Sequence, residues 1–265
     1  MDVLKDVLQK FDSVSLADIQ NVELMDRVDS KYVFPFSQLP KILEGMISSY
    51  RLLEINNVRV QRYESLYYDT DDFQLYSKHH AGRLNRWKLR FRKYIDSGGL
   101  TFFEIKYKTI KGRTIKKRLK MTNILSEFDE KSGNFLKKST PFIPEIFSPK
   151  IWVKYSRMTF VNKYSRERLT IDTHLHFLNT DSTNVLEQKF SHLVIAESKR
   201  GNASSISEFI RLVRLDGIRE GAMSKYCFGI YNLFKEVKKN NFKPAVRFIH
   251  KMAQTDFSKM QSHPN

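Results

Sequence analysis

The dominant pattern along the chain is an alternation of apolar and polar residues with a period of two. It recurs in segments that are bounded by Gly, Pro, Asn or Asp, as is typical of β-strands. Successive side chains of a strand point to opposite faces, so each segment predicts a strand with one apolar face. The eight expected strands cover residues 26–34, 58–69, 85–94, 100–108, 113–121, 151–162, 167–177 and 190–199.

Other segments place apolar residues at helical spacing or carry a helix-start signal. They predict helices over residues 3–11, 37–47, 70–76, 204–216 and 224–236. We find no internal repeat and no low-complexity linker, which favours one domain over residues 1–236. Residues 237–265 are polar and basic, and we expect them to form a mobile C-terminal tail.

The charged residues share one face of the predicted sheet. The chain has 46 Lys and Arg against 29 Asp and Glu, a net charge of +17. In strand 85–94, every second residue is basic, and Trp87, Leu89 and Phe91 occupy the opposite face. Like charges side by side on neighbouring strands are destabilising, so a bound polyanion would compensate for this arrangement. Arg and Lys both bind phosphate well, which favours a phosphate-bearing ligand. The alternative interpretation is a charged face that is only exposed to solvent.

Two features of the sequence bear on the cellular location of the protein. No apolar run approaches the roughly 20 residues that a membrane-spanning helix needs. Cys227 is the single cysteine, which excludes an intrachain disulfide and any Cys-based metal site. Together with an N-terminus unlike a signal peptide, these observations predict a cytoplasmic protein, although a membrane-protein partner stays open.

Nine short motifs occur in order along the expected strands. They are Arg27-x-Asp29-x-Lys31-Tyr32, Tyr67-Tyr68-Asp69-Thr70, Lys88-Leu89-Arg90-Phe91-Arg92, Glu104-Ile105-Lys106, Ile115-Lys116-Lys117-Arg118, Tyr155-x-Arg157, Glu167-Arg168-Leu169-Thr170-Ile171-Asp172-Thr173, Glu197-Ser198-Lys199 and Ser224-Lys225-Tyr226. The series resembles the VTC domain, the polyphosphate polymerase module of the vacuolar transporter chaperone complex. This family belongs to the triphosphate tunnel metalloenzymes, and the resemblance covers residues 26–230.

The resemblance implies an α+β fold in which an eight-stranded antiparallel β-barrel closes into a tunnel with flanking helices. It implies a polyphosphate polymerase that transfers the γ-phosphoryl group of ATP to inorganic polyphosphate, with Mn²⁺ or Mg²⁺ as cofactor. The expected catalytic residues are Arg90, Arg92, Lys106 and Arg157. The expected substrate-binding residues are Lys31, Lys88, Lys116, Tyr155, Arg168, Lys199 and Lys225. Glu197 is the expected metal ligand, with Asp29 or Glu104 as additional carboxylates.

Three alternatives remain open at this point. In the first, Asp29 and Glu104 serve only to pair with Lys31 and Lys106. A tunnel-fold triphosphatase would use water as the acceptor, but its usual Glu-x-Glu-x-Lys start is replaced here by Arg27-x-Asp29-x-Lys31. A non-catalytic nucleic-acid or polyphosphate-binding protein would use the same basic strands. Nucleic acid is not expected as a partner, because the large apolar residues mostly lie opposite the basic ones.

Overall fold

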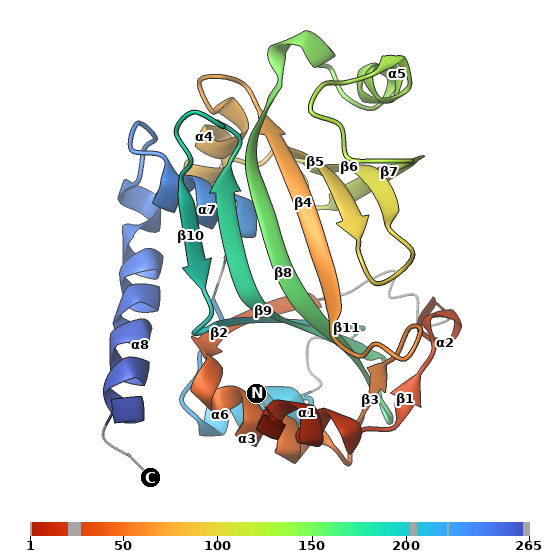
Figure 1. The fold of residues 1–265 in the computed structure, drawn as a ribbon, viewed down its shortest axis with the longest axis vertical. Coiled ribbons are helices and arrows are strands. Elements are labelled where there is room, and N and C mark those ends of the chain that lie inside the picture. The colour runs from red at the N-terminus through yellow and green to blue at the C-terminus, as the bar shows by residue number, and fades with distance from the viewer. Residues whose placement is uncertain (1, 21–27, 202–205, 222, 262–265) are drawn as a thin grey trace.

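The computed structural model describes residues 2–20, 28–201, 206–221 and 223–261. One large antiparallel sheet dominates it, and helices cover parts of both faces (Figure 1). Eight strands form a continuous hydrogen-bonded path in the order β2-β11-β9-β8-β4-β5-β6-β7. Their bounds are β2 Val28–Pro35, β4 Gln61–Asp69, β5 Arg86–Tyr94, β6 Leu100–Lys108, β7 Thr114–Met121, β8 Ser148–Asn162, β9 Glu167–Asn179 and β11 Leu193–Arg200.

These eight strands are the ones that the alternation predicts, with their ends moved by a few residues. Residues 26 and 27 of the first expected strand lie outside the described part of the chain. Three further strands were not predicted, namely β1 Ser13–Val14, β3 Tyr50–Leu53 and β10 Glu187–Phe190. Each spans at most four residues, which is too short for a period of two to be recognised.

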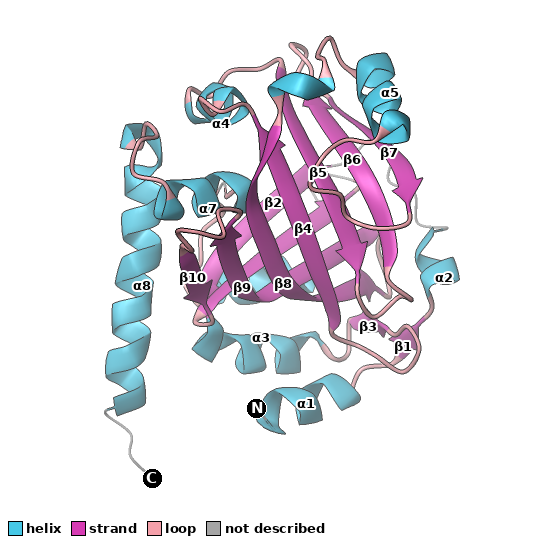
Figure 2. Cartoon of the chain, turned by 45° about the horizontal axis from the view of Figure 1, so that its top comes forward, coloured by secondary structure: helices cyan, strands magenta, loops and turns pink. Residues whose placement is uncertain are grey.

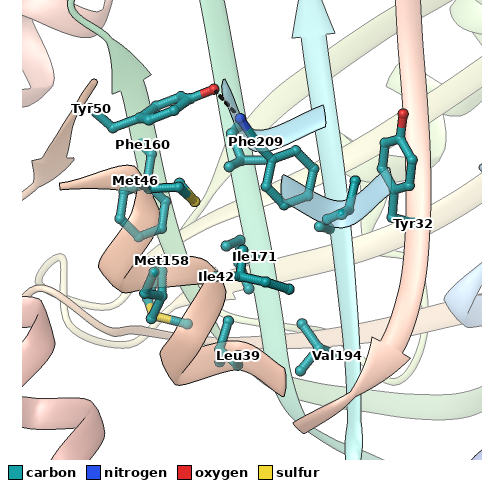
Figure 3. Packing of buried hydrophobic residues seen from close by; sticks show 14 of the residues in the cluster. Tyr32, Leu39, Ile42, Met46, Tyr50, Met158, Phe160, Ile171, Val194 and Phe209 are labelled. Atoms are coloured by element: carbon teal, nitrogen blue, oxygen red, sulfur yellow. Dashed lines mark hydrogen bonds between the residues drawn. The ribbon is translucent and has the colours of Figure 1, made fainter. Parts of the chain in front are cut away.

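Three helices cover the outer face of the sheet at one end: α1 Asp2–Gln9, α3 Leu39–Met46 and α6 Glu208–Leu215. Figure 3 shows Leu39, Ile42 and Met46 of α3 packed against apolar strand residues. The Tyr50 hydroxyl accepts a hydrogen bond from the backbone N–H of Phe209 at 3.3 Å, which joins α6 to this layer. The predicted helices 3–11, 37–47 and 204–216 are therefore confirmed, the last for its described residues.

The connection between β7 and β8 contains an unpredicted helix, α5 Glu130–Ser139. The Asp129 carboxylate caps it by accepting a hydrogen bond from the N–H of Ser132 at 2.8 Å. Leu136 packs into the apolar cluster that includes Phe91 and Phe103 on the outer face of β5 and β6. Other short helical segments are α2 Leu16–Gln20, α4 Gln74–His80 and the 3₁₀ turns η1 Phe36–Gln38, η2 Pro144–Ile146 and η3 Asn240–Phe242.

The opposite face of β8 and β9 is covered at one end by α7 Lys225–Leu233, as the sequence predicted for 224–236. Gly229 lets this helix approach the sheet closely. A Cβ atom at that position would lie 2.4 Å from Ile151 Cδ1 and 2.6 Å from Phe177 Cδ1. The helix thus fills the apolar end of this face and presents its N-terminus to the polar part.

The C-terminal residues, expected from the sequence as a mobile tail, contain a helix. The helix α8 Lys243–Gln261 occupies most of them, and it runs alongside the sheet next to β10 (Figure 1). Val246 and Ile249 are buried in the same apolar cluster as α7. Their spacing of three places both on one face of the helix, a short apolar stripe that the many basic neighbours hide in the sequence.

The sheet curls strongly, so that β2 crosses behind β8 and β4 (Figure 2). Lys31 of β2 lies close enough to Lys88 of β5 to help lower the pKa of that amine, although burial is the larger cause. However, the pairings among the described residues end at β2 and β7 without joining them. The structure shows a curled antiparallel sheet with flanking helices, and it does not show the expected closure into a barrel.

No helix in the described ranges is both long and apolar enough to cross a membrane.

Candidate functional site

Cross-strand register places the expected site residues on one face of the curled sheet, which we call the inner face. Neighbouring strands bring the following partners side by side: Lys31 with Glu197, Asp29 and Arg168 with Lys199, Arg157 with Asp172, Tyr67 with Arg90, Arg90 with Glu104, and Lys88 and Lys116 with Lys106. Because residues opposite each other point the same way, all these side chains share one face. Parity within strands predicted this face for the charged residues of β2, β5, β6, β7, β9 and β11, whereas Arg157 was expected there from the resemblance.

Glu104 forms the centre of one ion-pair group. Its buried carboxylate accepts hydrogen bonds from Arg90 Nε at 2.8 Å and Nη2 at 2.5 Å, and its other oxygen contacts the Lys116 amine. Burial alone would raise the pKa of Glu104, but the charges of Arg90, Arg92 and Lys116 outweigh burial and hold it well below its usual range. Glu104 therefore stays ionised and orients two cations, whereas the sequence suggested Lys106 as its partner.

Asp172 forms the centre of a second group of the same design. It accepts two hydrogen bonds from Arg157, at 2.6 and 2.8 Å, and one from Lys225 Nζ at 2.5 Å. Burial would raise the pKa of Asp172, but Arg157 and Lys225 lower it below its usual range. Each centre thus joins one arginine and one lysine, and here the lysine comes from α7.

Glu197 lies in a third and looser group. Its carboxylate is 3.4 Å from Lys31 Nζ and 3.7 Å from Lys199 Nζ. Burial opposes ionisation, yet the charges of Lys199 and Lys31 lower the pKa of Glu197 to about 2. Asp29 lies near this group, with its carboxylate 4.0 Å from Lys199 Nζ, and Arg168 stands opposite Lys199 on the neighbouring strand.

The family that the sequence resembles implies a divalent metal, which the inner-face carboxylates would have to coordinate. In residues 2–20, 28–201, 206–221 and 223–261, no three His, Cys, Asp or Glu side chains are grouped closely enough to hold a metal. Glu197 fits as a single ligand, because Mg²⁺ is commonly bound by one or two carboxylates together with phosphate oxygens. Glu104 and Asp172 fit less well, since cations already occupy both of their oxygens.

Lys106 and Lys88 stand side by side between the groups. The charge of Arg90, followed by burial, holds the pKa of Lys106 well below its ordinary value. Burial likewise lowers the pKa of Lys88, whose amine donates to the Ser224 hydroxyl at 2.9 Å. An anion bound at this point would raise the pKa of both amines, because opposite charge favours ionisation.

Tyr155 lies between the arginines. The guanidinium groups of Arg157 and Arg92 lie 5.3 and 5.7 Å from the centre of its ring, and Lys225 Nζ lies 4.8 Å from the same centre. Its hydroxyl is buried and has no hydrogen-bond partner in the described part of the chain. A buried donor of this kind is costly unless a ligand satisfies it, which suits the expected contact with phosphate.

Sequence reasoning missed several residues of the inner face. Asp172 shares parity with Arg168, but a lone acid among basic residues gave no sign that it joins Arg157 to Lys225. Tyr63 and Ser65 of β4 carry no charge and produced no signal, and Tyr67 stood within the Tyr67-Tyr68-Asp69-Thr70 motif without an assigned role. Their odd numbering within β4 places all three on the inner face. Aromatic residues did not distinguish the two faces of this strand, because the outer residue Tyr68 is also aromatic.

The VTC domain family model matches residues 26–234. The chain belongs to the VTC domain family. The inner face of this VTC domain is lined by basic side chains from several strands. The comparison with curated proteins finds no match.

Two solved structures align with this VTC domain at low sequence identity. A Hippeastrum protein, named as a candidate adenylyl cyclase and described as having a dominant triphosphatase activity, gives a TM-score of 0.51 at 12% identity, covering 80% of this chain and 98% of that chain. A candidate adenylate cyclase from Bacillus halodurans gives 0.44 at 12% identity, covering 80% of this chain and 100% of that chain. The first likeness shows a shared fold.

Proposed function

We propose that this VTC domain is a polyphosphate polymerase that transfers the γ-phosphoryl group of ATP to the end of a polyphosphate chain. The observation that carries the proposal is the state of its inner-face acids. Glu104 and Asp172 are each held by two cations, and the pKa of both carboxylates lies below its usual range. Such carboxylates are poor general bases. A site of this kind suits an acceptor that is already an anion.

The reaction then needs no proton transfer to the protein. An oxygen of the acceptor's terminal phosphate forms a bond to the γ-phosphorus of ATP. The bond from that phosphorus to the β–γ bridging oxygen breaks, and its electron pair stays with the ADP that leaves. Charge is spread over the transferring group, so positioning and neutralisation supply most of the catalysis.

The basic side chains of the inner face supply that neutralisation. Arg90 and Arg92 of β5 and Lys106 of β6 clamp the transferring group, and Arg157 of β8 binds it from across β4. Lys31, Lys88, Lys116, Arg168, Lys199 and Lys225 hold the rest of the nucleotide triphosphate and the polyphosphate. When bound, a Mn²⁺ or Mg²⁺ ion on Glu197 and the phosphates would offset negative charge between donor and acceptor.

A triphosphatase is the second candidate function. It is favoured by the similarity to the Hippeastrum protein, which is described as having a dominant triphosphatase activity. Hydrolysis needs a group that accepts a proton from water. The pKa of Glu197, about 2, makes this carboxylate a weak base as well. This candidate therefore ranks below the polymerase.

A role in binding nucleic acid is less favoured. Single-stranded nucleic acids are bound by exposed aromatic platforms beside basic residues. The inner-face aromatics Tyr63, Tyr67 and Tyr155 are buried and stack on one another or on Tyr226.

One assay separates the two enzyme activities. Purified protein is incubated with ATP and Mn²⁺, with and without a short polyphosphate primer, and the products are resolved on a gel. Lys106→Ala removes a positive charge from the inner face. Lys117→Ala is the matched control, because Lys117 lies one strand over on the opposite face and is exposed.

We expect the wild type and Lys117→Ala to form polymer, and Lys106→Ala to lose most of the activity. Release of phosphate without polymer would instead identify a triphosphatase. No consumption of ATP by the wild type would exclude both enzymes. Equal activity of Lys106→Ala and Lys117→Ala would place the chemistry away from the inner face.

A further inference from the structure

Strand β4 lies at the centre of the inner face but brings no charge to it between Gln61 and Tyr67. The strand alternates Gln61, Tyr63, Ser65 and Tyr67 on that face, between the arginines of β5 on one side and Arg157 of β8 on the other. The charged residues between Gln61 and Tyr67, Arg62 and Glu64, pair with Asp96 and Lys154. The uncharged residues nevertheless contact the basic side chains on both flanking strands.

Tyr67 holds Arg90. Its hydroxyl accepts a hydrogen bond from Arg90 Nη1 at 2.7 Å, and the guanidinium group lies 5.6 Å from the centre of the ring. The Tyr67 ring is itself fixed, because it stacks on Tyr226 at 5.1 Å and Tyr226 donates a hydrogen bond to the buried carboxylate of Asp69. The position of Arg90 is therefore tied to a rigid aromatic pair.

The contact with Tyr67 completes the fixing of the Arg90 fork. Glu104 accepts from Nε and Nη2, and Tyr67 accepts from Nη1. A guanidinium group has five N–H donors, so these three bonds leave two, one on each terminal nitrogen. The two remaining donors keep a fixed direction, which is the arrangement that bidentate recognition of a phosphate needs.

Tyr63 acts on two arginines at once. Its ring is stacked on Tyr155, with centres 5.2 Å apart and an interplanar angle of 7°. The guanidinium groups of Arg157 and Arg92 lie 5.2 and 5.4 Å from the Tyr63 ring. Cations at this distance are attracted to an aromatic face, and the attraction grows when water is excluded. The stacked tyrosines thus hold two like charges from different strands near each other.

We propose that Tyr63 and Tyr67 are positioning residues that orient Arg157, Arg92 and Arg90 for phosphate. The inference rests on the proposed function, since it assumes a phosphate-bearing ligand on the inner face. Ser65 supports the same role, because its hydroxyl accepts a hydrogen bond from Arg92 Nε at 3.1 Å. Uncharged side chains of β4 thus orient the arginines of the flanking strands β5 and β8.

The test measures binding of tripolyphosphate by titration calorimetry at fixed pH and salt. Tyr67→Phe keeps the ring and removes the acceptor for Arg90, and we expect it to weaken binding about tenfold, the effect of losing one charge-assisted hydrogen bond. Tyr68→Phe is the matched control. Its hydroxyl donates to the Leu125 carbonyl on the outer face, so its loss should change affinity less than about twofold.

For Tyr63 the ring is what matters. Tyr63→Leu should weaken tripolyphosphate binding about fivefold, the order of one desolvated cation–π contact, whereas Tyr63→Phe should bind like the wild type. Unfolding midpoints in urea are measured for all four tyrosine variants. A merely structural role would lower the midpoint together with the affinity, whereas a positioning role lowers the affinity of variants that remain as stable as the wild type. Binding is compared only among variants that are folded at the temperature of the titration.

The outcomes distinguish the inference from the function beneath it. A wild type that does not bind tripolyphosphate overturns both. If the wild type binds and Lys106→Ala weakens binding, but Tyr67→Phe and Tyr63→Leu bind normally, the phosphate site stands and the positioning role is wrong. Equal weakening by Tyr63→Phe and Tyr63→Leu would also contradict the role assigned to the Tyr63 ring.

Discussion

The Arg157 guanidinium donates to both oxygens of the Asp172 carboxylate, from Nε at 2.6 Å and from Nη2 at 2.8 Å. This bidentate pair joins β8 to β9, and Lys225 of α7 adds a third hydrogen bond to the same carboxylate at 2.5 Å. A single buried acid therefore ties the N-terminus of α7 to the sheet and holds two cations in the candidate site.

Asp172→Asn should destabilise the fold. The substitution leaves the buried Arg157 and Lys225 without a counter-ion, and removing one partner of a buried pair costs about 3–5 kcal/mol. We expect this loss in the free energy of unfolding measured by urea denaturation at neutral pH. Asp71→Asn is the control, because the Asp71 side chain is 92% exposed in its pair with Lys150 and should barely change stability. Similar midpoints for the two variants would refute a structural role for Asp172.

Much of the sheet was predictable from the sequence. Arg86, Lys88, Arg90 and Arg92 alternate with buried residues such as Leu89 and Phe91, so local periodicity alone fixed which face each side chain takes. The same parity predicted the faces of Arg90 and Lys106, whereas the place of Arg157 beside them was implied by the resemblance.

The partners of these residues were not predictable. Glu104 is two residues from Lys106 in the sequence, yet it pairs with Arg90 and Lys116 on the two flanking strands. Such pairs depend on the register between strands, which is set by turn geometry and burial and not by the alternation within one strand. Lys225 reaches Asp172 only because α7 packs on the sheet through Gly229, a contact between distant segments.

The burial of α8 predicts that Ile249 supports the fold. Ile249 is 3% exposed against the apolar cluster of α7, so Ile249→Ala should lower the free energy of unfolding by about 2–4 kcal/mol. Its neighbour Phe248 is 59% exposed, and Phe248→Ala should change it by less than about 0.5 kcal/mol. Urea denaturation compares the two. If Ile249→Ala unfolds at the wild-type midpoint, residues 243–261 behave as the mobile tail that the sequence suggested.

Glu197 is the inner-face acid best placed to help hold a metal, because its nearest cations are 3.4 and 3.7 Å away. Glu197→Gln removes the carboxylate charge and should raise the Mn²⁺ concentration for half-maximal binding in the presence of tripolyphosphate at least about tenfold. Glu187→Gln on β10 is the control, since Glu187 pairs with His176 and Lys189 away from these groups. An unchanged Mn²⁺ requirement in Glu197→Gln would remove this residue as a ligand.

Protons should be taken up when an anion binds. Lys106 is surrounded by Arg90 and Arg92 of β5, Glu104 of β6 and Lys116 of β7, and the arginine charges and burial lower its pKa. A bound triphosphate reverses the local charge and raises that pKa again. Above the lowered pKa the amine must therefore gain a proton on binding, so affinity for tripolyphosphate should fall as pH rises.

Titration calorimetry at pH 8 in two buffers with different ionisation enthalpies counts these protons. We expect net uptake by the wild type and a smaller uptake by Lys106→Met, which has no amine to protonate. The decrease should be partial, because burial also lowers the pKa of Lys88 and of Lys116 on the same face. Lys117→Met, on the opposite face, should leave uptake unchanged. Equal uptake by Lys106→Met and the wild type would mean that Lys106 is already protonated before the anion arrives.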